Sequence, residues 1–459
     1  MDGTGTKDDP YIIMSIEDLV KCSKEASEGK LANVYINLGR NLNFKSDLSY
    51  CDTSTKEYNE FLGITDNVGI KEALTNTKYN GFKPIEGIKA SSFQGNNYTI
   101  KNLWEHVSNN SGLFSNSKIE ILNLTLTGKI ICDGDYAGGI VSESQSGIVI
   151  KIENCKSYVN IKSNGVNTAG ILASQLGAEI NNCINYGNIE GKNTVAGIVN
   201  YFSKATNCIN YGNVKGTEYV ASISSCYTTV IDCKNFGKIE GERFVGGIIT
   251  KITHNTNIIG AINYGQVKGN SSVGGIIASL GNKTSELANL INYADIEGIS
   301  NVGGIAGEIT DLGLLANSVN FGNVKGEKFV AGIAGNIAFT QGEQNEIYNC
   351  YTVGNIEGTT NVCALVGAKT GYGTHYLKYC YWKKELNLEY GSATVPTTWG
   401  ILQAENTTAY EDSYLKSQDF VNLLNENAKK LNEERKDNEN FVKLSEWRLS
   451  SDNGYPGFE

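Results

Sequence analysis

This chain has little proline and histidine, and it lacks any long apolar run. Only four prolines occur in 459 residues, so nearly every residue keeps a backbone N–H for pairing in a sheet. No apolar run approaches the ~20 residues of a membrane-spanning helix. The three histidines, His106, His254 and His375, are far apart and have no cysteine at metal-ligand spacing. We therefore expect no membrane insertion, no bound metal and no cofactor.

Other shortages narrow the possible partners and activities. The net charge is −10 without a basic cluster, which disfavours nucleic acid and anionic membranes as partners. The eleven cysteines are an odd number and include no Cys-x-x-Cys pair, so we expect buried free thiols. No serine-nucleophile motif or phosphate-binding loop occurs either.

One short phrase is abundant. It reads Asn-Tyr-Gly-Asn-Ile-Glu-Gly from Asn185, and each copy precedes an apolar Val-x-Gly-Ile patch. Close variants begin at Asn210, Asn235, Asn263, Asn292, Asn320 and, in decayed form, Thr352. Successive patches lie 25 to 32 residues apart. A unit of this length cannot bury its own apolar face and must stack on its neighbours, which predicts a solenoid.

The composition of the repeat selects the kind of solenoid. It is rich in Ile, Val, Tyr, Thr, Asn and Gly, has no helical stretch, and lacks the signatures of helical and leucine-rich repeats. Short apolar runs between Gly and Asn indicate brief strands joined by tight corners. We predict an all-β solenoid, a parallel β-helix of about ten coils with three short strands per coil.

A charged residue follows the central Ile or Val of every phrase, and its sign alternates from copy to copy. The series is Lys162, Glu190, Lys215, Glu240, Lys268, Glu297, Lys325 and Glu357. In a parallel stack, equivalent positions lie above one another, where opposite charges attract and like charges repel. The alternation predicts one outward, structural charge ladder in register.

Further columns follow from the same alignment. One column consists mostly of cysteines and other small residues, which is typical of a buried site. Its members are Cys155, Cys183, Cys208, Cys233, Ala261, Leu290, Ser318, Cys350 and Cys380. The first Asn of each phrase predicts an asparagine ladder at a corner. Apolar columns begin at Val195 and Ile198.

An aromatic column is the better candidate for a binding site. It consists of Tyr158, Tyr186, Tyr211, Phe236, Tyr264, Tyr293 and Phe321. Strand alternation places Cys183, Asn185 and Ile189 on one face and Tyr186 on the other. If exposed, the column offers flat apolar faces with polar rims to sugar rings or a protein. A packed structural ladder is the alternative, because Phe replaces Tyr twice.

The two ends of the chain differ from the repeats. Residues 1–97 predict an N-terminal cap, with a helix from Ser15 to Gly29, a strand at 34–38 and a long excursion at 45–92. Residues 98–382 predict the β-helix proper. Residues 383–459 predict a C-terminal cap with one helix from about Ser417, after which Trp447 and Asn453-Gly454-Tyr455-Pro456 return to the stack.

Evidence for an enzyme is weak in the sequence. A glycosidase needs two carboxylates roughly 5–9.5 Å apart, but Lys215 lies between Glu190 and Glu240 and would neutralise both. Asp133 and Asp135 could bind calcium, although such pairs more often shape a turn. We expect His375 to be a solvated loop residue. The variable segments between repeats, 249–261, 278–290 and 335–350, are where a solenoid usually binds ligands.

The repeat resembles the GLUG motif. The residues that carry the resemblance are Gly-Gly-Ile-Val at 138–141, Gly-Gly-Ile-Ile at 246–249 and 274–277, Gly-Gly-Ile-Ala at 303–306, and the flanks at 5–13, 417–420 and 453–456. The resemblance covers nearly the whole chain and implies a right-handed parallel β-helix that is bacterial and either secreted or on the cell surface. Some GLUG regions accompany IgA-cleaving metalloproteases. This chain has no His-Glu-x-x-His, so that activity is not carried over, and the motif transfers no functional residues.

We therefore predict a non-catalytic, adhesin-like binding module for host or environmental glycans or proteins, including proteins of a neighbouring cell, acting as a monomer. The alternatives are a carbohydrate-active β-helix enzyme (a polysaccharide lyase or hydrolase) and a pure structural stalk. The opening Met1-Asp2-Gly3-Thr4 is not that of a signal peptide. For a secreted or surface protein, we expect that one was removed.

Overall fold

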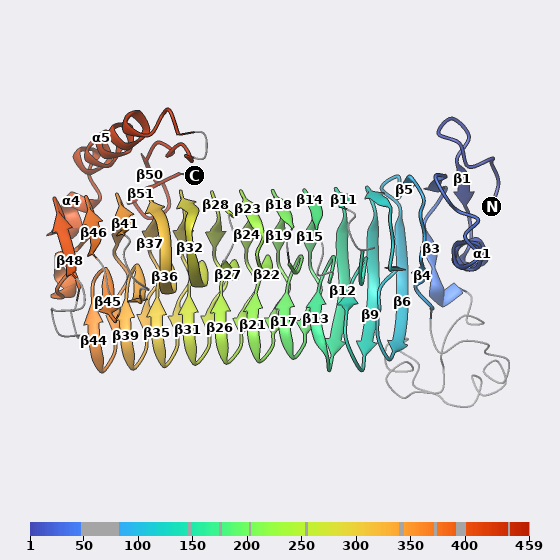
Figure 1. Cartoon of the computed structure of the whole chain (residues 1–459), viewed down its shortest axis with the longest axis horizontal. Helices are drawn as coiled ribbons and strands as arrows, with labels where there is room; N and C mark the ends of the chain where they lie inside the picture. Colours follow the sequence, from blue (N-terminus) through green and yellow to red (C-terminus); the bar gives the residue numbers. More distant parts are fainter. Residues whose placement is uncertain are drawn as a thin grey trace. The chain divides into compact units, whose positions relative to one another are not determined.

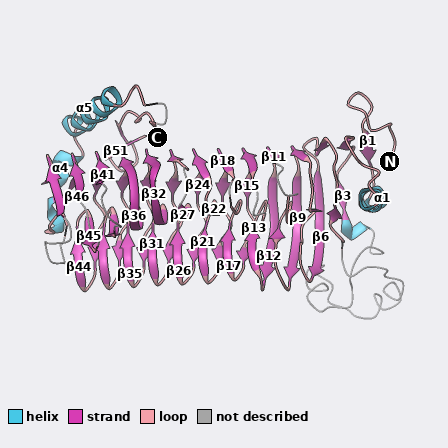
Figure 2. Ribbon diagram, viewed as in Figure 1, coloured by secondary structure: helices cyan, strands magenta, loops and turns pink. Residues whose placement is uncertain are grey.

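The computed structural model describes residues 1–46, 82–144, 149–173, 177–201, 203–252, 256–338, 344–370, 374–391, 401–438 and 441–458. The chain groups into two compact units, Met1–Gly216 (unit 1) and Thr217–Glu459 (unit 2). Both are parallel β-solenoids with few helices, and together they contain about 12 turns (Figures 1 and 2). The predicted fold class is confirmed. None of the described helices is long and apolar enough to cross a membrane.

Most strands of unit 1 belong to three parallel sheets. The first sheet contains β1 (Tyr11–Ile13), β2 (Tyr35–Leu38), β5 (Ser92–Gln94), β8 (Glu120–Leu122), β11 (Ile150–Glu153), β14 (Ala178–Asn181) and β18 (Lys204–Thr206). The second contains β3 (Leu42–Asn43), β6 (Thr99–Val107), β9 (Thr125–Cys132), β12 (Lys156–Ser163), β15 (Ile184–Asn185), β16 (Ile189–Glu190), β19 (Ile209–Asn210) and β20 (Val214–Lys215). The third contains β10 (Ala137–Gly138), β13 (Val166–Ala169) and β17 (Asn193–Ala196). A separate pair joins β4 (Ile85–Glu86) and β7 (Phe114–Ser115).

Unit 2 repeats this arrangement. Its first sheet contains β22 (Ser224–Cys226), β23 (Thr229–Ile231), β27 (Ile249–Ile252), β28 (Ile258–Ile259), β32 (Ile277–Ala288), β36 (Ala306–Ala316), β40 (Ala334–Ile337), β41 (Gln344–Tyr348), β45 (Val366–Lys369), β46 (Thr374–Lys378) and β48 (Ile401–Glu405). Its second contains β24 (Lys234–Asn235), β25 (Ile239–Glu240), β29 (Ile262–Asn263), β30 (Val267–Lys268), β33 (Ile291–Asn292), β34 (Ile296–Glu297), β37 (Val319–Asn320), β38 (Val324–Lys325), β42 (Tyr351–Thr352), β43 (Ile356–Glu357), β47 (Tyr381–Lys383) and β49 (Thr408–Tyr410). Its third contains β21 (Glu218–Ala221), β26 (Arg243–Gly246), β31 (Ser271–Gly274), β35 (Ser300–Gly303), β39 (Lys328–Ala331) and β44 (Thr360–Cys363).

The coil count of about ten was too low, because strands outside the repeated phrase also stack. At the N-terminal end β1 pairs with β2, and β2 pairs with β5, all in parallel. At the other end β48 pairs with β46 and β49 pairs with β47. These coils lack the Asn-Tyr-Gly signature by which coils were counted, so sequence similarity could not reveal them.

Helices lie at the two ends of the chain. Helix α1 (Ile16–Ser27) begins after Ser15, whose hydroxyl accepts a hydrogen bond from the Asp18 N–H, as the capping pattern predicted. Helix α4 (Asp412–Leu415) precedes α5 (Gln418–Glu434), which is capped in the same way by Ser417. After α5 the short antiparallel pair β50 (Arg448–Leu449) and β51 (Pro456–Gly457) completes the chain. Most of the predicted excursion at 45–92 falls in residues 47–81, outside the described residues.

The coils are filled by apolar side chains, and the six from Asn185 to Asn320 each add one buried asparagine at the same position. In unit 2 the Asn263 Nδ2 donates to Asn292 Oδ1 at 2.9 Å, and the Asn292 Nδ2 donates to Asn320 Oδ1 at 2.7 Å. The ten described cysteines are all free and buried, including Cys183, whose thiol pKa burial raises well above its ordinary value. The ladder satisfies polar groups that a purely apolar core would leave unpaired.

His375 does not lie in a solvated loop, so that expectation was wrong. It lies within β46, paired in register with Leu402 of β48, and its side chain is fully buried. The glycine-rich run before it suggested a loop, but strand pairing with the next coil turns the side chain inward. His254 lies outside the described residues.

Candidate functional site

The outer face of the second sheet in unit 1 carries three rows of side chains. The asparagine and tyrosine rows have one member in each of three coils, whereas the aliphatic row has one in only two of them, because Lys156 occupies its position in the first. In the second of these coils Cys183 and Asn185 are fully buried, while Asn182 and Tyr186 are exposed. Successive residues of a strand point to opposite faces, which explains this alternation. The asparagine row contains Asn154, Asn182 and Asn207. The aliphatic row contains Ile184 and Ile209, both partly exposed. The tyrosine row contains Tyr158, Tyr186 and Tyr211.

The asparagine row forms the corner between the first and second sheets. Asn154, Asn182 and Asn207 have φ values of 55°, 52° and 53°, in the left-handed region. Asparagine tolerates this conformation better than other side chains with a Cβ. The corner therefore explains the residue type, and its geometry displays each side-chain amide on the surface.

The tyrosine row is exposed, but its ring faces are not. Tyr158, Tyr186 and Tyr211 have exposed fractions of 42%, 36% and 43%. The first two rings stack at a centroid distance of 4.3 Å and the next two at 5.0 Å, each pair within 4° of parallel. The coil spacing of ~4.8 Å matches a ring-stacking distance. The row therefore presents ring edges and hydroxyls outward, rather than the flat faces that the sequence suggested.

The aromatic column continues in unit 2, where most of it is covered. Phe236 is 41% exposed and stacks on Tyr264 at 4.7 Å. Tyr264, Tyr293 and Phe321 stack in turn, at 5.0 and 4.9 Å, but are only partly exposed. All three pack against an apolar cluster that the strands share with the C-terminal cap, and the Phe321 ring lies 5.9 Å from the Tyr455 ring of the cap. The cap lies beside these strands in Figure 1. The column is therefore exposed from Tyr158 to Phe236, as the binding hypothesis requires. From Tyr264 to Phe321 it is packed, as the structural-ladder alternative requires.

The covering segment is residues 441–458, and asparagines of unit 2 hold its backbone. Asn289 and Asn317 occupy the same corner as the asparagine row, with φ values of 59° and 53°. The Ser445 N–H donates to Asn289 Oδ1 at 2.9 Å, and the Asn317 Nδ2 donates to the Ser445 carbonyl at 3.0 Å. The Trp447 indole N–H donates to Asn317 Oδ1 at 2.6 Å. Two corner asparagines thus bind both backbone groups of one residue and a nearby indole.

Beside these hydrogen bonds lies an apolar contact. Trp447 is 1% exposed and packs in one cluster with Ile291 and Val319, which are fully buried. These two residues are the unit 2 counterparts of Ile184 and Ile209. The same side-chain positions are therefore buried in unit 2 and partly exposed in unit 1.

An ion pair fastens the end of α5. The Arg435 guanidinium lies 2.9 Å from Glu346 Oε2 and 3.7 Å from Glu286 Oε1. Burial raises the pKa of Glu286, although the Val442 N–H and Arg435 favour its charged form. This ion pair and the indole contact are both structural attachments of the cap.

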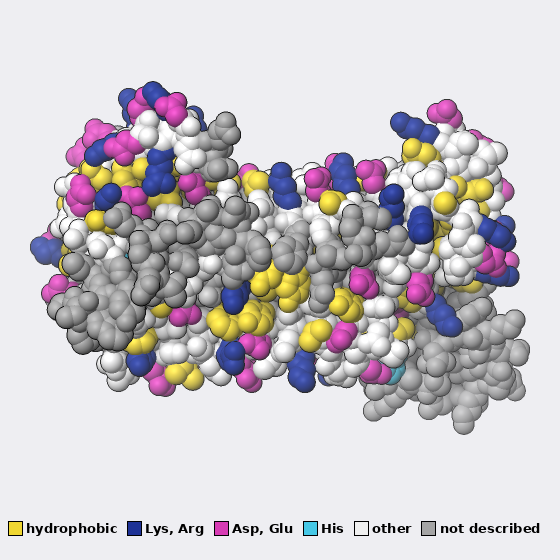
Figure 3. Space-filling view, viewed as in Figure 1, with side chains coloured by type: hydrophobic (Ala, Val, Ile, Leu, Met, Phe, Trp, Pro, Cys, Tyr) yellow, Lys and Arg dark blue, Asp and Glu magenta, His cyan; other side chains and the backbone are white. Residues whose placement is uncertain are grey.

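The charge ladder lies on the same sheet and is in register. Lys162 pairs with Glu190 in unit 1 at 3.8 Å, and Lys268 pairs with Glu297 in unit 2 at 2.9 Å. Over the visible face in Figure 3, basic and acidic side chains of the described residues are interspersed rather than grouped by sign. Exposed pairs of this kind support the stack without forming a binding patch.

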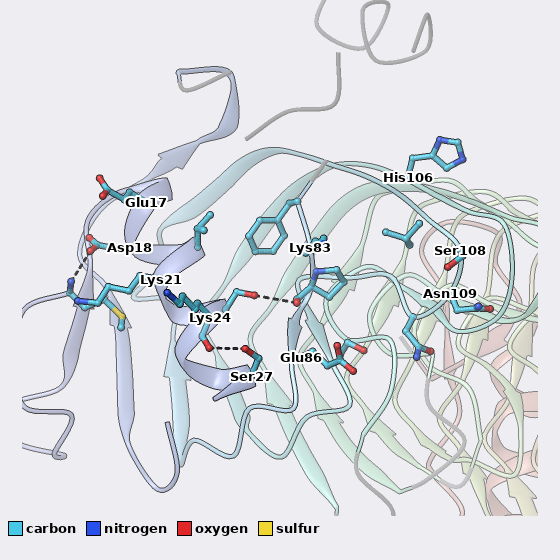
Figure 4. A pocket seen from close by; sticks show the side chains of 18 residues that line it. Glu17, Asp18, Lys21, Lys24, Ser27, Lys83, Glu86, His106, Ser108 and Asn109 are labelled. Atoms are coloured by element: carbon cyan, nitrogen blue, oxygen red, sulfur yellow. Dashed lines mark hydrogen bonds and ion pairs between the residues drawn. The ribbon is translucent and has the colours of Figure 1, made fainter. Parts of the chain in front are cut away.

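A cleft of about 1200 Å³ in unit 1 is a second candidate site. It is lined by α1, by residues 82–86 and by residues 106–110. Lys21 and Lys24 project from α1, whereas His106 lies on the far side (Figure 4). The charged side chains labelled there are spread along the cleft and do not converge on one point. Nothing in the described part of this cleft forms a catalytic group of residues.

The remaining titratable candidates have structural partners. His106 Nε2 lies 3.3 Å from Asp133 Oδ2, and Asp135 Oδ1 accepts the Val166 N–H at 2.8 Å. Within the described residues no three His, Cys, Asp or Glu side chains cluster as metal ligands would. The variable segments at 249–261 and 335–350 fall partly outside the described residues.

The asparagine row was missed in the sequence. The signal was present as an Asn before the thiol column, in Asn154-Cys155, Asn182-Cys183 and Asn207-Cys208. The sequence prediction relied on the thiol column and did not include the asparagine one residue before it. The outward aromatic column was identified, but its division into exposed and covered parts depends on the distant segment 441–458.

Fold and site together define a parallel β-solenoid with a polar-aromatic outer face that is exposed in unit 1. The sequence matches no family model and no curated protein. Among solved structures, the chain is similar to a protein from Bacteroides ovatus that is provisionally described as an immunoglobulin A1 protease. The two are 15% identical, the likeness covers 100% of this chain and 94% of that chain, and the TM-score is 0.31. A likeness this weak carries no argument about activity.

Proposed function

We propose that this chain is a non-catalytic bacterial binding module, secreted or on the cell surface, whose ligand contacts the tyrosine row of unit 1. The observation that carries the proposal is the exposure of Tyr158, Tyr186 and Tyr211 at positions whose unit 2 counterparts Tyr293 and Phe321 pack against the cap. Aromatic rings with a polar rim are frequent in binding surfaces. The GLUG resemblance of the repeats supports the extracellular location.

A protein ligand fits this surface better than a sugar. A sugar ring binds to a free aromatic face, but the faces of Tyr186 are turned toward Tyr158 and Tyr211. Ring edges, phenol hydroxyls and exposed amides suit a polypeptide, which supplies both apolar side chains and backbone hydrogen-bonding groups. Glycan binding remains the alternative outcome of the experiment.

The test is binding of the purified chain to an array of glycans, mucins and extracellular proteins. We expect specific binding that is lost in the double variant Tyr186→Ala/Tyr211→Ala, with the fold verified by circular dichroism. Lys162→Gln is the matched control, because it alters the same sheet without removing a ring. Binding that survives the double variant would refute the tyrosine row as the site, and no binding at all would favour the structural stalk.

A further inference from the structure

The attachment of residues 441–458 to unit 2 shows what kind of ligand this outer face can hold. Residues 441–447 of the segment contain no helix or turn, and the backbone of Ser445 is bound by corner asparagines. The indole of Trp447 packs in one cluster with Ile291, Val319 and Tyr351. Unit 1 repeats the corner asparagines and the two aliphatic positions. We propose that the outer face of unit 1 is a docking site for an extended polypeptide segment that carries a tryptophan. This inference rests on the proposed function and specifies the ligand of the same surface.

The correspondence holds position by position. Asn182 and Asn207 are the counterparts of Asn289 and Asn317, in the same left-handed conformation. Ile184 and Ile209 are the counterparts of Ile291 and Val319. Tyr186 and Tyr211 are the counterparts of Tyr293 and Phe321. All these residues follow the same order within the coil, Asn, x, aliphatic, Asn, aromatic, so the three rows run side by side in both units.

The difference between the units is in burial alone. Asn317 is 0% exposed and Asn289 is 5% exposed beneath the segment, whereas Asn182 and Asn207 are exposed. Ile291 and Val319 are fully buried, whereas Ile184 and Ile209 are partly exposed. A surface built like an established interface, but left exposed, is expected to bind a ligand of the same chemistry.

The corner asparagines of unit 2 recognise backbone groups and an indole, rather than a particular amino-acid sequence. A side-chain amide offers N–H donors and an acceptor oxygen, so two neighbouring asparagines can bind the carbonyl and the N–H of an extended residue. In unit 2 these two groups belong to Ser445. The second asparagine also accepts the indole N–H of Trp447. A tryptophan two residues after the bound backbone is therefore the specific element.

A separate partner fits better than the tail of a second copy. The tail of each chain is engaged by its own unit 2, where Trp447 is 1% exposed in an apolar cluster. Helix α5 adds to this attachment, since Asn425 Oδ1 accepts the Trp447 N–H at 2.7 Å and Asn432 Oδ1 accepts the Leu444 N–H at 2.8 Å. Releasing the tail would expose that cluster to water.

The probe is a synthetic peptide of residues 441–458, titrated into the full chain with fluorescence anisotropy as the readout. The intact tail competes at the high effective concentration of a tethered segment, so free peptide is directed to unit 1. The peptide lacks the helix that assists the tail, so we expect a dissociation constant between micromolar and millimolar.

The variant is Asn182→Gly/Asn207→Gly, which removes both amides and retains backbones with positive φ. Glycine occupies the corresponding corner at Gly260, with a φ of 64°, so the fold tolerates it. We expect affinity to fall at least about tenfold, from the loss of two to three hydrogen bonds. A peptide with Trp447→Ala is expected to lose binding to a similar or greater extent, and Lys162→Gln to leave it unchanged.

Three results would overturn the inference. Equal binding to the glycine variant would place the peptide elsewhere, including on unit 2 after displacement of the tail. No saturable binding up to about 1 mM would remove polypeptide as the ligand; array binding that depends on Tyr186 and Tyr211 would then leave the proposed function intact. Self-association of the full chain that the glycine variant abolishes would make a second copy the occupant.

Discussion

Asparagine has two separate roles in this molecule, and its conformation distinguishes them. Asn263 faces inward within a strand and bonds its neighbours along the buried ladder. Asn182 lies three residues before the equivalent ladder position of its own coil, with a φ of 52°, and faces solvent. The first role stabilises the stack, while the second makes polar groups available at the surface.

Asn263→Ala is expected to lower the free energy of unfolding of unit 2 by about 2–4 kcal/mol. Its Oδ1 accepts the Gly265 N–H at 3.2 Å and its Nδ2 reaches Asn292, so truncation leaves buried polar groups without partners. Urea denaturation measures the change. The exposed Asn270→Ala, in the same unit, is the control, with an expected loss under about 1 kcal/mol; equal losses in both variants would contradict a stabilising ladder.

Glu105 is a buried acid inside unit 1. It is 0% exposed, and one carboxylate oxygen accepts the Gly112 N–H at 2.8 Å. The other oxygen has no hydrogen-bond partner among the described residues. Burial raises the pKa of Glu105 to about 8, from an ordinary value of 4.5. The folded state therefore retains a proton at neutral pH that the unfolded state releases.

The sign of the resulting pH dependence follows. Between the two pKa values the folded state binds more protons, so the free energy of unfolding of unit 1 falls as pH rises from 4.5 to about 8, by up to a few kcal/mol. Glu105→Gln is expected to remove this slope and to be the more stable form at pH 8. Hydrogen exchange of β6 and β9 at both pH values measures it. The exposed Glu190→Gln should keep the slope, and a parent protein without one would contradict the assignment.

At the scale of the strand, the charge ladder makes a testable contribution to register. Glu297 lies between Lys268 and Lys325 on neighbouring coils. Glu297→Lys would align three positive charges, and we expect a loss of about 0.5–1.5 kcal/mol that 0.5 M salt reduces. Glu297→Gln, which removes the attraction without adding a positive charge, should lose less. Chemical denaturation at low and high salt measures this loss of stability. A loss that does not depend on salt would indicate a packing defect instead of charge repulsion.

The C-terminal segment has one buried aromatic side chain, Trp447, at the centre of its contacts with unit 2. Trp447→Ala removes a buried indole and its hydrogen bond to Asn317, so we expect residues 441–458 to detach while the solenoid remains folded. Limited proteolysis and hydrogen exchange of that segment provide the measurement, and Leu449→Ala, at a position 40% exposed, is the control. Equal protection of the segment in both variants would show that the indole does not anchor it.

Prediction from sequence succeeded where one coil resembles the next. The columns that include Cys183, Asn185 and Tyr186 keep the same spacing from one another in successive repeats. Strand alternation alone therefore separated inward from outward residues. It failed where a feature occurs once. The pairing of β1 with β2 and of β48 with β46, the inward side chain of His375, and the contact of Phe321 with Tyr455 all depend on contacts between segments without a shared pattern.

At the scale of the whole molecule, a solenoid leaves an apolar row on its surface unless something covers it. In unit 2 that row contains Ile262, Ile291, Val319, Tyr351 and Tyr381, and the cap buries it. Without the cap, the row and the open edge of the final coil would both face water. We therefore expect the cap to prevent association as well as to add stability.

A chain that ends at Tyr410 lacks α4, α5 and residues 441–458. It should self-associate as its concentration rises, whereas the intact chain should not. Sedimentation velocity measures this, with circular dichroism to show that the strands persist. The truncated chain with Ile291→Lys/Val319→Lys should return toward a monomer, because charge in the row opposes apolar contact. A truncated chain that stays monomeric at every concentration would show that the cap stabilises the last coils without shielding them.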